Sequence, residues 1–316
     1  MKEHIVDEAD SDIRLDRWFK RHYPGLTHGG LEKALRKGEV RVAGKKAKSS
    51  DRLVSGQAII IKFDIKTATA KAMEERKKPE VNRVSLDDIA MIQESVLYKD
   101  ADVIVINKPP GLAVQGGTGV TKSVDSLLDA LKFELKERPK LVHRLDRDTS
   151  GILVLARSAK VATRLMHAFS KKEAEKIYWA LVKGVPEIRQ GKIDIPLSKQ
   201  DDGDIEKVGI DEEDGKRAVT FYTVIDNLSK MLSWVELMPV TGRTHQLRVH
   251  MAEIGHPILG DGKYGAREAF IDGMELSRKL HLHARRLVIP GMLDVTAPLP
   301  AHMEKSWKTL GLDYSE

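Results

Sequence analysis

Two short segments of the chain concentrate side chains that can act as acids, bases or anion ligands. The first, called here the aspartate loop (residues 143–151), reads His-Arg-Leu-Asp-Arg-Asp-Thr-Ser-Gly and runs directly into an aliphatic stretch. Reactive groups often lie on polar loops that rigid strands hold in place. On charge pattern alone, a surface loop of ion pairs explains the same residues more readily than a reactive site does.

The second segment, called here the arginine segment (residues 241–250), reads Thr-Gly-Arg-Thr-His-Gln-Leu-Arg-Val-His. It follows a strand-like run and opens a predicted helix. The free N–H groups of a helix N-terminus, next to Arg243, would suit a phosphate or a carboxylate. His245 and Arg248 are three residues apart and therefore share a helix face. A basic helix with one solvated face is the simpler alternative.

The surrounding hydrophobic pattern predicts the elements that must position these segments. Strand-like runs outnumber helical ones; the strands are expected at 103–106, 152–156, 177–182, 219–225, 234–238 and 286–289, and the helices near 124–135, 160–169 and 244–254. This pattern predicts a mixed α+β domain with a largely antiparallel sheet over residues 90–316. Residues 12–66 read as a small α/β module, and the polar, charged stretch 67–89 reads as a linker.

Composition excludes several classes of function. The chain has 316 residues and no cysteine, which rules out disulfides, thiolate nucleophiles and cysteine-held zinc or iron–sulfur sites. Its aliphatic runs are too short to span a bilayer, and its acidic start does not resemble a signal peptide. We therefore expect a cytoplasmic protein with no membrane association, and no obligate protein partner is evident.

The positive charge is concentrated near the N-terminus. The net charge is +6, yet residues 11–50 hold 11 Lys/Arg against 4 Asp/Glu, so this window carries +7 and the remainder −1. A dense basic surface favours contact with nucleic-acid phosphates, which adds affinity but little sequence readout. The cations predicted to contact nucleic-acid phosphates are Arg14, Arg17, Lys33, Arg36, Lys37, Arg41 and Lys45.

The aspartate loop resembles the signature of the RluA family of RNA pseudouridine synthases. Further motifs of that family follow in its order between about Leu97 and Pro300: Asn107–Gly111, Lys176–Gly184, Gly242–Arg248, Gly260–Gly265 and Leu282–Ala284. The basic module is similar to an S4 RNA-binding domain, although Gly30 stands where such modules often carry arginine. The combination most resembles the RluC-type branch of the family, whose members act on 23S ribosomal RNA.

The resemblance implies a cofactor-free and metal-free isomerase that converts uridine to pseudouridine in RNA. It implies that Asp146 is the essential carboxylate and that Arg243 forms an ion pair with it. Tyr178 would stack on the extruded uracil, and Arg144 would help fill the gap that the base leaves. His143, His245 and Arg248 are the remaining residues of the catalytic domain predicted to contact RNA.

Other interpretations remain open at the level of sequence. A pseudouridine synthase could act on transfer RNA instead, and a non-catalytic ribosomal RNA-binding factor could use the same fold. A glycosidase could use Asp146 and Asp148, although alternate residues of a strand point apart. A metal-dependent hydrolase could draw on His245, His250, Asp261, His281 and His283, but His245 and His250 are five residues apart rather than four.

Overall fold

The chain divides into two compact units. The computed structural model describes residues 2–63, 84–117, 120–202 and 205–313, and the contacts separate Met1–Asn82 from Arg83–Glu316. Most of the predicted linker, 67–89, lies outside the described residues. Its last part does not, because helix α4 (Leu86–Glu94) already belongs to the second unit, which therefore begins before residue 90.

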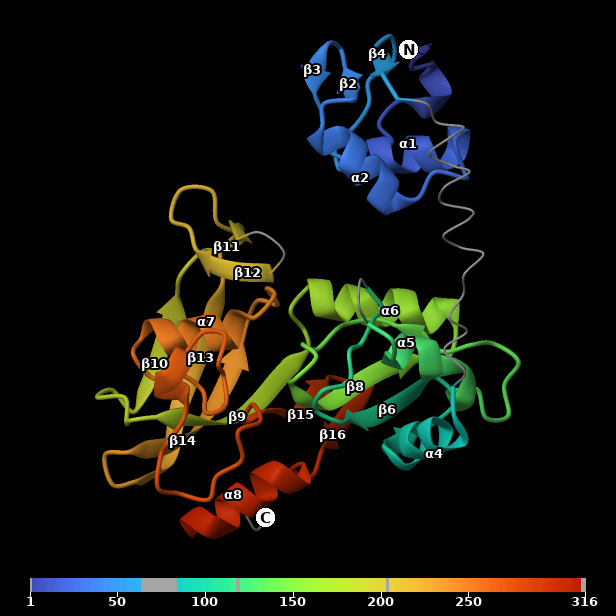
Figure 1. Cartoon of the computed structure of the whole chain (residues 1–316). Helices are drawn as coiled ribbons and strands as arrows, with labels where there is room; N and C mark the ends of the chain where they lie inside the picture. Colours follow the sequence, from blue (N-terminus) through green and yellow to red (C-terminus); the bar gives the residue numbers. More distant parts are fainter. Residues whose placement is uncertain (1, 64–83, 118–119, 203–204, 314–316) are drawn as a thin grey trace. The chain divides into compact units, whose positions relative to one another are not determined.

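The first unit is a small four-stranded sheet packed against two helices (Figure 1). The sheet order is β1-β4-β2-β3, and the unit starts before residue 12 because β1 pairs with β4. Trp18, Phe19 and Leu31 are buried in its core. The elements are β1 (Lys2–Ile5), η1 (Glu8–Asp10), α1 (Leu15–His22), α2 (His28–Arg36), β2 (Val40–Val42), β3 (Lys45–Lys46) and β4 (Ala58–Ile61).

The second unit is built on a large mixed sheet in which the strand order is β10-β13-β14-β9-β15-β8-β6-β5. The strands of that path are β5 (Val96–Lys99), β6 (Val103–Lys108), β8 (Ser150–Ala156), β9 (Glu175–Lys183), β10 (Gln190–Asp194), β13 (Val219–Leu228), β14 (Leu232–Pro239) and β15 (Leu282–Ile289). β7 (Lys140–Leu141) pairs with β8, and β16 (Leu293–Thr296) pairs with β15. The α+β fold with a largely antiparallel sheet is confirmed.

Helices cover both faces of this sheet because its central strands are apolar on both sides. Val103, Val105 and Val154 face α6 (Ala159–Ser170), which lies along β8 in Figure 1. Ile104 and Leu153, one residue out of phase, face α4, α5 (Val124–Leu127) and the 3-10 helix η2 (Leu128–Leu131). The helix expected at 124–135 is therefore shorter, and its second half is a 3-10 turn.

At the other end of the sheet, two further helices cover opposite faces. α7 (Gln246–Glu253) packs on one face, and α8 (Ala301–Leu310), near the C-terminus in Figure 1, packs on the other. A two-stranded hairpin, β11 (Leu197–Asp202) with β12 (Ile205–Ile210), was not expected from sequence. Among the described residues, none of the helices has the length and apolar character needed to cross a bilayer.

The two ends of the sheet meet at one parallel pairing, between β8 and β15, in register His283↔Ser150 and Ala284↔Gly151. Gly151 has φ +106°, and a Cβ at this position would lie 2.3 Å from the carbonyl oxygen of Ala284. Only glycine tolerates both the backbone conformation and the approach. β15, which carries His283, is therefore a central strand of the sheet.

We predict that Gly151→Ala destabilises the second unit by at least about 1–3 kcal/mol, because the added methyl group overpacks the β8–β15 junction. Urea unfolding monitored by tryptophan fluorescence measures this loss. Gly116→Ala is the matched control, since a Cβ at Gly116 meets no atom within 4 Å. Equal free energies of unfolding for the two variants would show that the β8–β15 junction can accommodate a methyl group.

Candidate active site

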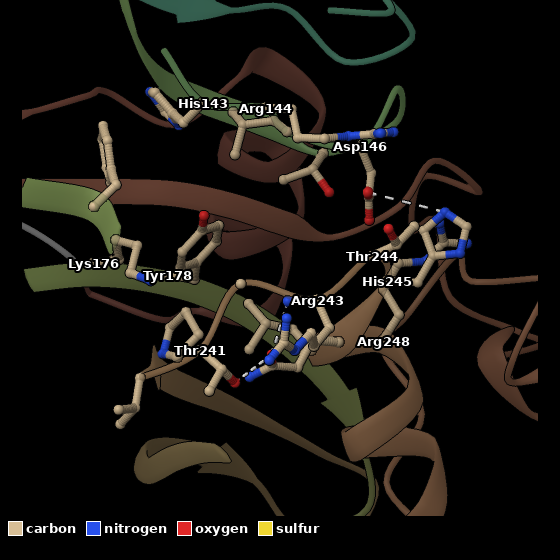
Figure 2. Close-up of a pocket in the computed structure, with 18 of the residues that line it drawn as sticks. His143, Arg144, Asp146, Lys176, Tyr178, Thr241, Arg243, Thr244, His245 and Arg248 are labelled. Carbon is tan, nitrogen blue, oxygen red and sulfur yellow. Dashed lines mark hydrogen bonds and ion pairs between the residues drawn. The ribbon is translucent and has the colours of Figure 1, made fainter. Parts of the chain in front are cut away.

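A pocket of about 540 Å³ lies between the aspartate loop and the arginine segment. Figure 2 shows Arg144 and Asp146 on one wall and Thr244 and His245 on the facing wall. Between them, β9 contributes Tyr178 to the floor. The sheet thus brings together two segments that are about a hundred residues apart in the sequence.

The aspartate loop is held from below by a buried lysine. Lys108, at the end of β6, donates hydrogen bonds of 2.9 Å each to the carbonyl oxygens of Pro109, Leu112 and Arg147. Burial lowers the pKa of Lys108 to about 7, whereas the carboxylates of Asp148 and Asp146 oppose that shift. Three carbonyl acceptors match the three donors of an ammonium group, so the arrangement favours the charged form. Lys108 fixes the backbone next to Asp146, a role that sequence reasoning did not assign.

Asp146 has an imidazole as its nearest ionic partner. His245 Nε2 lies 4.0 Å from Asp146 Oδ1, and the two side chains are only 15% and 16% exposed. The ion pair expected between Arg243 and Asp146 is not formed. Arg243 is exposed at the pocket rim, where its Nε donates to the carbonyl oxygen of Arg217 at 3.2 Å. That backbone contact draws the guanidinium away from the carboxylate.

The arginine segment is organised by Gln246, which sequence reasoning also missed. Its Oε1 accepts hydrogen bonds from the Thr241 hydroxyl at 2.7 Å and from the backbone N–H of Arg243 at 3.1 Å. Its Nε2 donates to Val219 O at 2.9 Å and to the Thr220 hydroxyl at 3.0 Å. A buried amide with all these contacts ties the turn to β13. The only available signal was its position at the start of α7, five residues after Thr241.

Arg248 was expected to contact RNA; in the structure its guanidinium has an internal partner, and the RNA contact stays a prediction. Its guanidinium is buried and forms two 2.7 Å hydrogen bonds to Asp261, which is itself 1% exposed. Asp261 Oδ1 also accepts the backbone N–H groups of Lys263 and Tyr264, both at 3.2 Å. The Asp261 hydrogen bonds and charge raise the pKa of Arg248 against the opposing effect of burial. Arg248 therefore braces the 260–265 loop beside the pocket.

The floor and one side of the pocket suit a flat apolar ring. Met166 and Phe169, both on α6, line the cavity together with Tyr178. Burial, and to a smaller extent the charge of Asp146, raise the pKa of Tyr178, so its phenol stays protonated. Its hydroxyl points into the cavity in Figure 2, and the exposed Arg144 lines the opposite wall.

His143 lies at the pocket margin, but its ring is used internally. Its Nε2 accepts a hydrogen bond from the Val154 N–H at 2.8 Å, and the centroids of the His143 and Phe169 rings are 4.6 Å apart. Burial lowers the pKa of His143 to about 3. The neutral ring therefore ties the aspartate loop to β8, and an RNA contact at His143 stays a prediction.

The residues of the alternative metal site do not converge. His250 contacts Thr220, His281 contacts Ser306, and the His283 ring lies 2.9 Å from the Ser150 hydroxyl. Asp261 is occupied by Arg248. Over residues 2–63, 84–117, 120–202 and 205–313, no group of three such side chains has a metal-binding arrangement.

In the first unit, the predicted cations divide into two groups. Arg14 pairs with Asp16 at 2.6 Å, Arg41 donates to Gly44 O at 3.1 Å, and Lys37 Nζ lies 4.0 Å from Glu39 Oε1. The second group is exposed and consists of Arg17, Lys33, Arg36 and Lys45. Lys33, Arg36 and Lys37 lie together on α2 and its C-cap.

We predict that His143 makes folding sensitive to acid. Above pH 6.5 the His143 ring is neutral in both the folded and the unfolded protein. Below pH 6.5 the unfolded protein binds a proton at this ring, whereas the folded protein does so only near pH 3. Stability should therefore fall as pH drops through that window. His143→Gln keeps an acceptor for Val154 but does not titrate, so between pH 7 and 5 it should lose about 1–2 kcal/mol less than the parent in urea unfolding. Identical pH dependence would contradict this assignment.

Comparison with known proteins identifies one family to which the chain is similar. A family model described as RNA pseudouridylate synthase matches residues 102–253. The chain is 37% identical to ribosomal large subunit pseudouridine synthase C of Rickettsia bellii, covering 92% of this chain and 96% of that one. It is 35% identical to the mitochondrial RNA pseudouridine synthase 4 of Arabidopsis thaliana, over 93% and 78% of the two chains.

A solved structure shares the fold. Human RNA pseudouridylate synthase domain containing 4 superposes with a TM-score of 0.60 at 30% identity, covering 72% of this chain and 97% of that one. The sheet, the pocket and the full-length relatives lead to one conclusion: the chain belongs to the RNA pseudouridylate synthase family.

Proposed function

We propose that this protein converts specific uridines of large-subunit ribosomal RNA to pseudouridine, with Asp146 as the reacting carboxylate. The observation that carries the proposal is the position of Asp146, on the wall of a pocket of about 540 Å³ with a tyrosine on its floor. Such a volume is typical of small-ligand sites. The names of the relatives from Rickettsia and Vibrio cholerae, which specify the ribosomal large subunit, support the substrate.

The reaction breaks the bond between uracil N1 and ribose C1′, turns the base and joins C5 to C1′, with loss of the C5 hydrogen. A carboxylate suits this chemistry because it can act at the ribose or add to the uracil ring. The loop around Asp146 is fixed by Lys108 and His143, so the carboxylate is held before the substrate arrives. Preorganisation of this kind reduces the cost of reaching the transition state.

The other pocket residues have roles that follow from exposure and chemistry. An enzyme that acts on a base within structured RNA extrudes it, at a cost of a few kcal/mol. We assign the ring of Tyr178 to stacking on the extruded uracil, since it lies on the pocket floor. Arg144, exposed on the wall, would occupy the gap left in the RNA, and Arg243, exposed at the rim, would contact a phosphate.

We assign RNA docking to the first unit, as an S4-like module. The four exposed cations of the second group leave phosphate contacts available, as does Lys37, whose exposed ion pair with Glu39 is 4.0 Å long. Arg14 and Arg41 have closer internal partners. Phosphate contacts add salt-dependent affinity without reading sequence. The second unit would then select the uridine, and the 67–89 segment would connect the two.

Asp146→Asn should reduce isomerisation by about 1000-fold or more, equivalent to about 4 kcal/mol in the barrier, while the fold stays intact. The assay is tritium release from 23S ribosomal RNA transcribed with uridine tritiated at C5. Asp148→Asn, on the same loop, is the control and should stay within about threefold, because its partner Arg147 forms only an exposed ion pair. Near-normal release by the Asp146 variant would refute its role, and the same assay with EDTA tests the expectation that no metal is needed.

Neutralising Lys33, Arg36 and Lys37 to glutamine should weaken binding to ribosomal RNA and flatten its salt dependence. Each lost phosphate contact reduces the slope of log Kd against log salt by about 1, so a change of about 2–3 is expected. Neutralising Lys136, Lys230 and Lys305, which are exposed on the second unit away from the pocket, changes the net charge equally. Equal effects of the two triple variants would argue against a docking surface on the first unit.

A further inference from the structure

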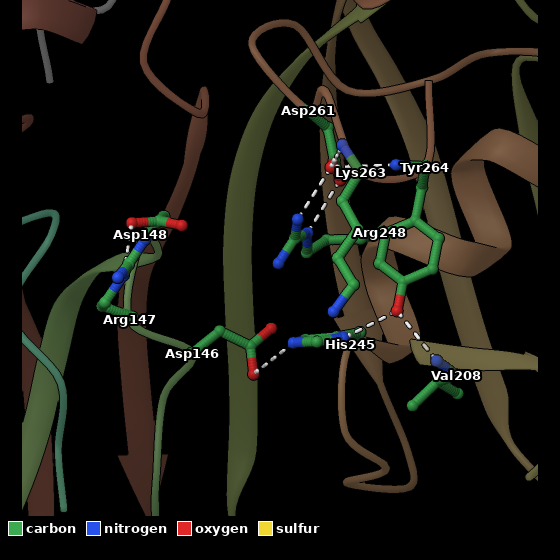
Figure 3. A network of polar contacts seen from close by, with 9 residues as sticks. All are labelled: Asp146, Arg147, Asp148, Val208, His245, Arg248, Asp261, Lys263 and Tyr264. Atoms are coloured by element: carbon green, nitrogen blue, oxygen red, sulfur yellow. Dashed lines mark hydrogen bonds and ion pairs between the residues drawn. The ribbon is translucent and has the colours of Figure 1, made fainter. Parts of the chain in front are cut away.

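A chain of polar contacts leads from the β11–β12 hairpin to Asp146 (Figure 3). The backbone N–H of Val208, in β12, donates to the Tyr264 hydroxyl oxygen at 3.1 Å. That oxygen lies 2.7 Å from His245 Nδ1, and His245 Nε2 faces Asp146 Oδ1 at 4.0 Å. Four separate segments of the second unit thus meet in one line.

These contacts favour one of the two neutral tautomers of the His245 ring. Because the Tyr264 oxygen accepts the Val208 N–H, its own hydrogen is available to His245 Nδ1. Nδ1 then acts as the acceptor, and the single proton of a neutral ring lies on Nε2. Burial lowers the pKa of His245 although the charge of Asp146 opposes this, so the neutral ring is favoured. The ring therefore presents an N–H to Asp146.

Both rings are held by contacts that do not involve Asp146. His245 has φ +53°, a left-handed conformation that is unusual for a residue with a side chain and is often found at functional sites. The backbone N–H of Tyr264 is bonded to Asp261, and its ring lies 5.1 Å from the Arg248 guanidinium. The position of the imidazole is thus set by the 260–265 loop and the start of α7.

We propose that Tyr264 and His245 are positioning residues that hold the Asp146 carboxylate through His245 Nε2, with the hairpin fixing the tyrosine. This rests on the proposed function of Asp146. A closure of about 1 Å would bring Nε2 and Oδ1 to hydrogen-bond distance, and contacts of this kind commonly tighten in the substrate complex. With Oδ1 held, Oδ2 is left to react with the uridine.

The test exploits the two nitrogens of His245. In His245→Gln the side-chain amide reaches the place of Nε2, and in His245→Asn it reaches only the place of Nδ1. If His245 positions Asp146, the Asn variant loses about tenfold more of the single-turnover rate than the Gln variant does, with unchanged Kd for RNA. If His245 serves only to anchor Tyr264, the order is reversed. Equal rates, or a change confined to Kd, would likewise overturn the proposal.

A double-mutant cycle tests the link to Tyr264. Tyr264→Phe keeps the ring and removes the hydroxyl, and it should slow single turnover about tenfold, or about 1.4 kcal/mol, in the parent. In the His245→Asn background the same substitution should have no further effect, because the contact with Asp146 is already lost. If the losses of rate from the two substitutions are additive, the proposal that Tyr264 acts through His245 is overturned. The parent's tritium release from 23S ribosomal RNA separates these outcomes from a failure of the proposed function, which would remove the signal altogether.

Discussion

The close approach of β8 to β15 is the constraint on which the rest of the second unit depends. Gly151 lies so near the backbone of Ala284 that no side chain fits between them, and this contact joins the two ends of the sheet. The aspartate loop ends at this glycine, and Leu282, two residues before Ala284, lines the pocket. The position of Asp146 relative to the opposite wall is therefore set by a backbone contact.

Buried polar groups then turn this junction into a defined site. Lys108 holds the backbone of the aspartate loop, Gln246 holds the arginine segment, and Arg248 holds the 260–265 loop through Asp261. Each is costly to bury unless its hydrogen bonds are satisfied, so each permits few arrangements of the loop that it contacts. The pocket is consequently rigid where it carries Asp146 and open where Arg144 and Arg243 face solvent.

Residue patterns predict the buried strands of the second unit but not the contacts of its polar side chains. The pattern of consecutive apolar residues predicts the strands around Val105 and Val154, because such runs must be buried on both faces. It does not predict the β11–β12 hairpin, whose charged sequence has no apolar alternation. Nor does it show that Arg248 is buried against Asp261, since an arginine in a motif has the same letter whether it contacts RNA or a carboxylate.

The sequence by itself determined the family, the mixed sheet, the aspartate loop and the concentration of charge in residues 11–50, because these depend on residue order and local pattern. Tertiary structure alone decided the partners. Asp146 faces His245 and not Arg243, and His143 bonds to β8, because these contacts join segments whose separation depends on the packing of the whole sheet. Long-range distances between side chains are not encoded in the spacing of any one segment.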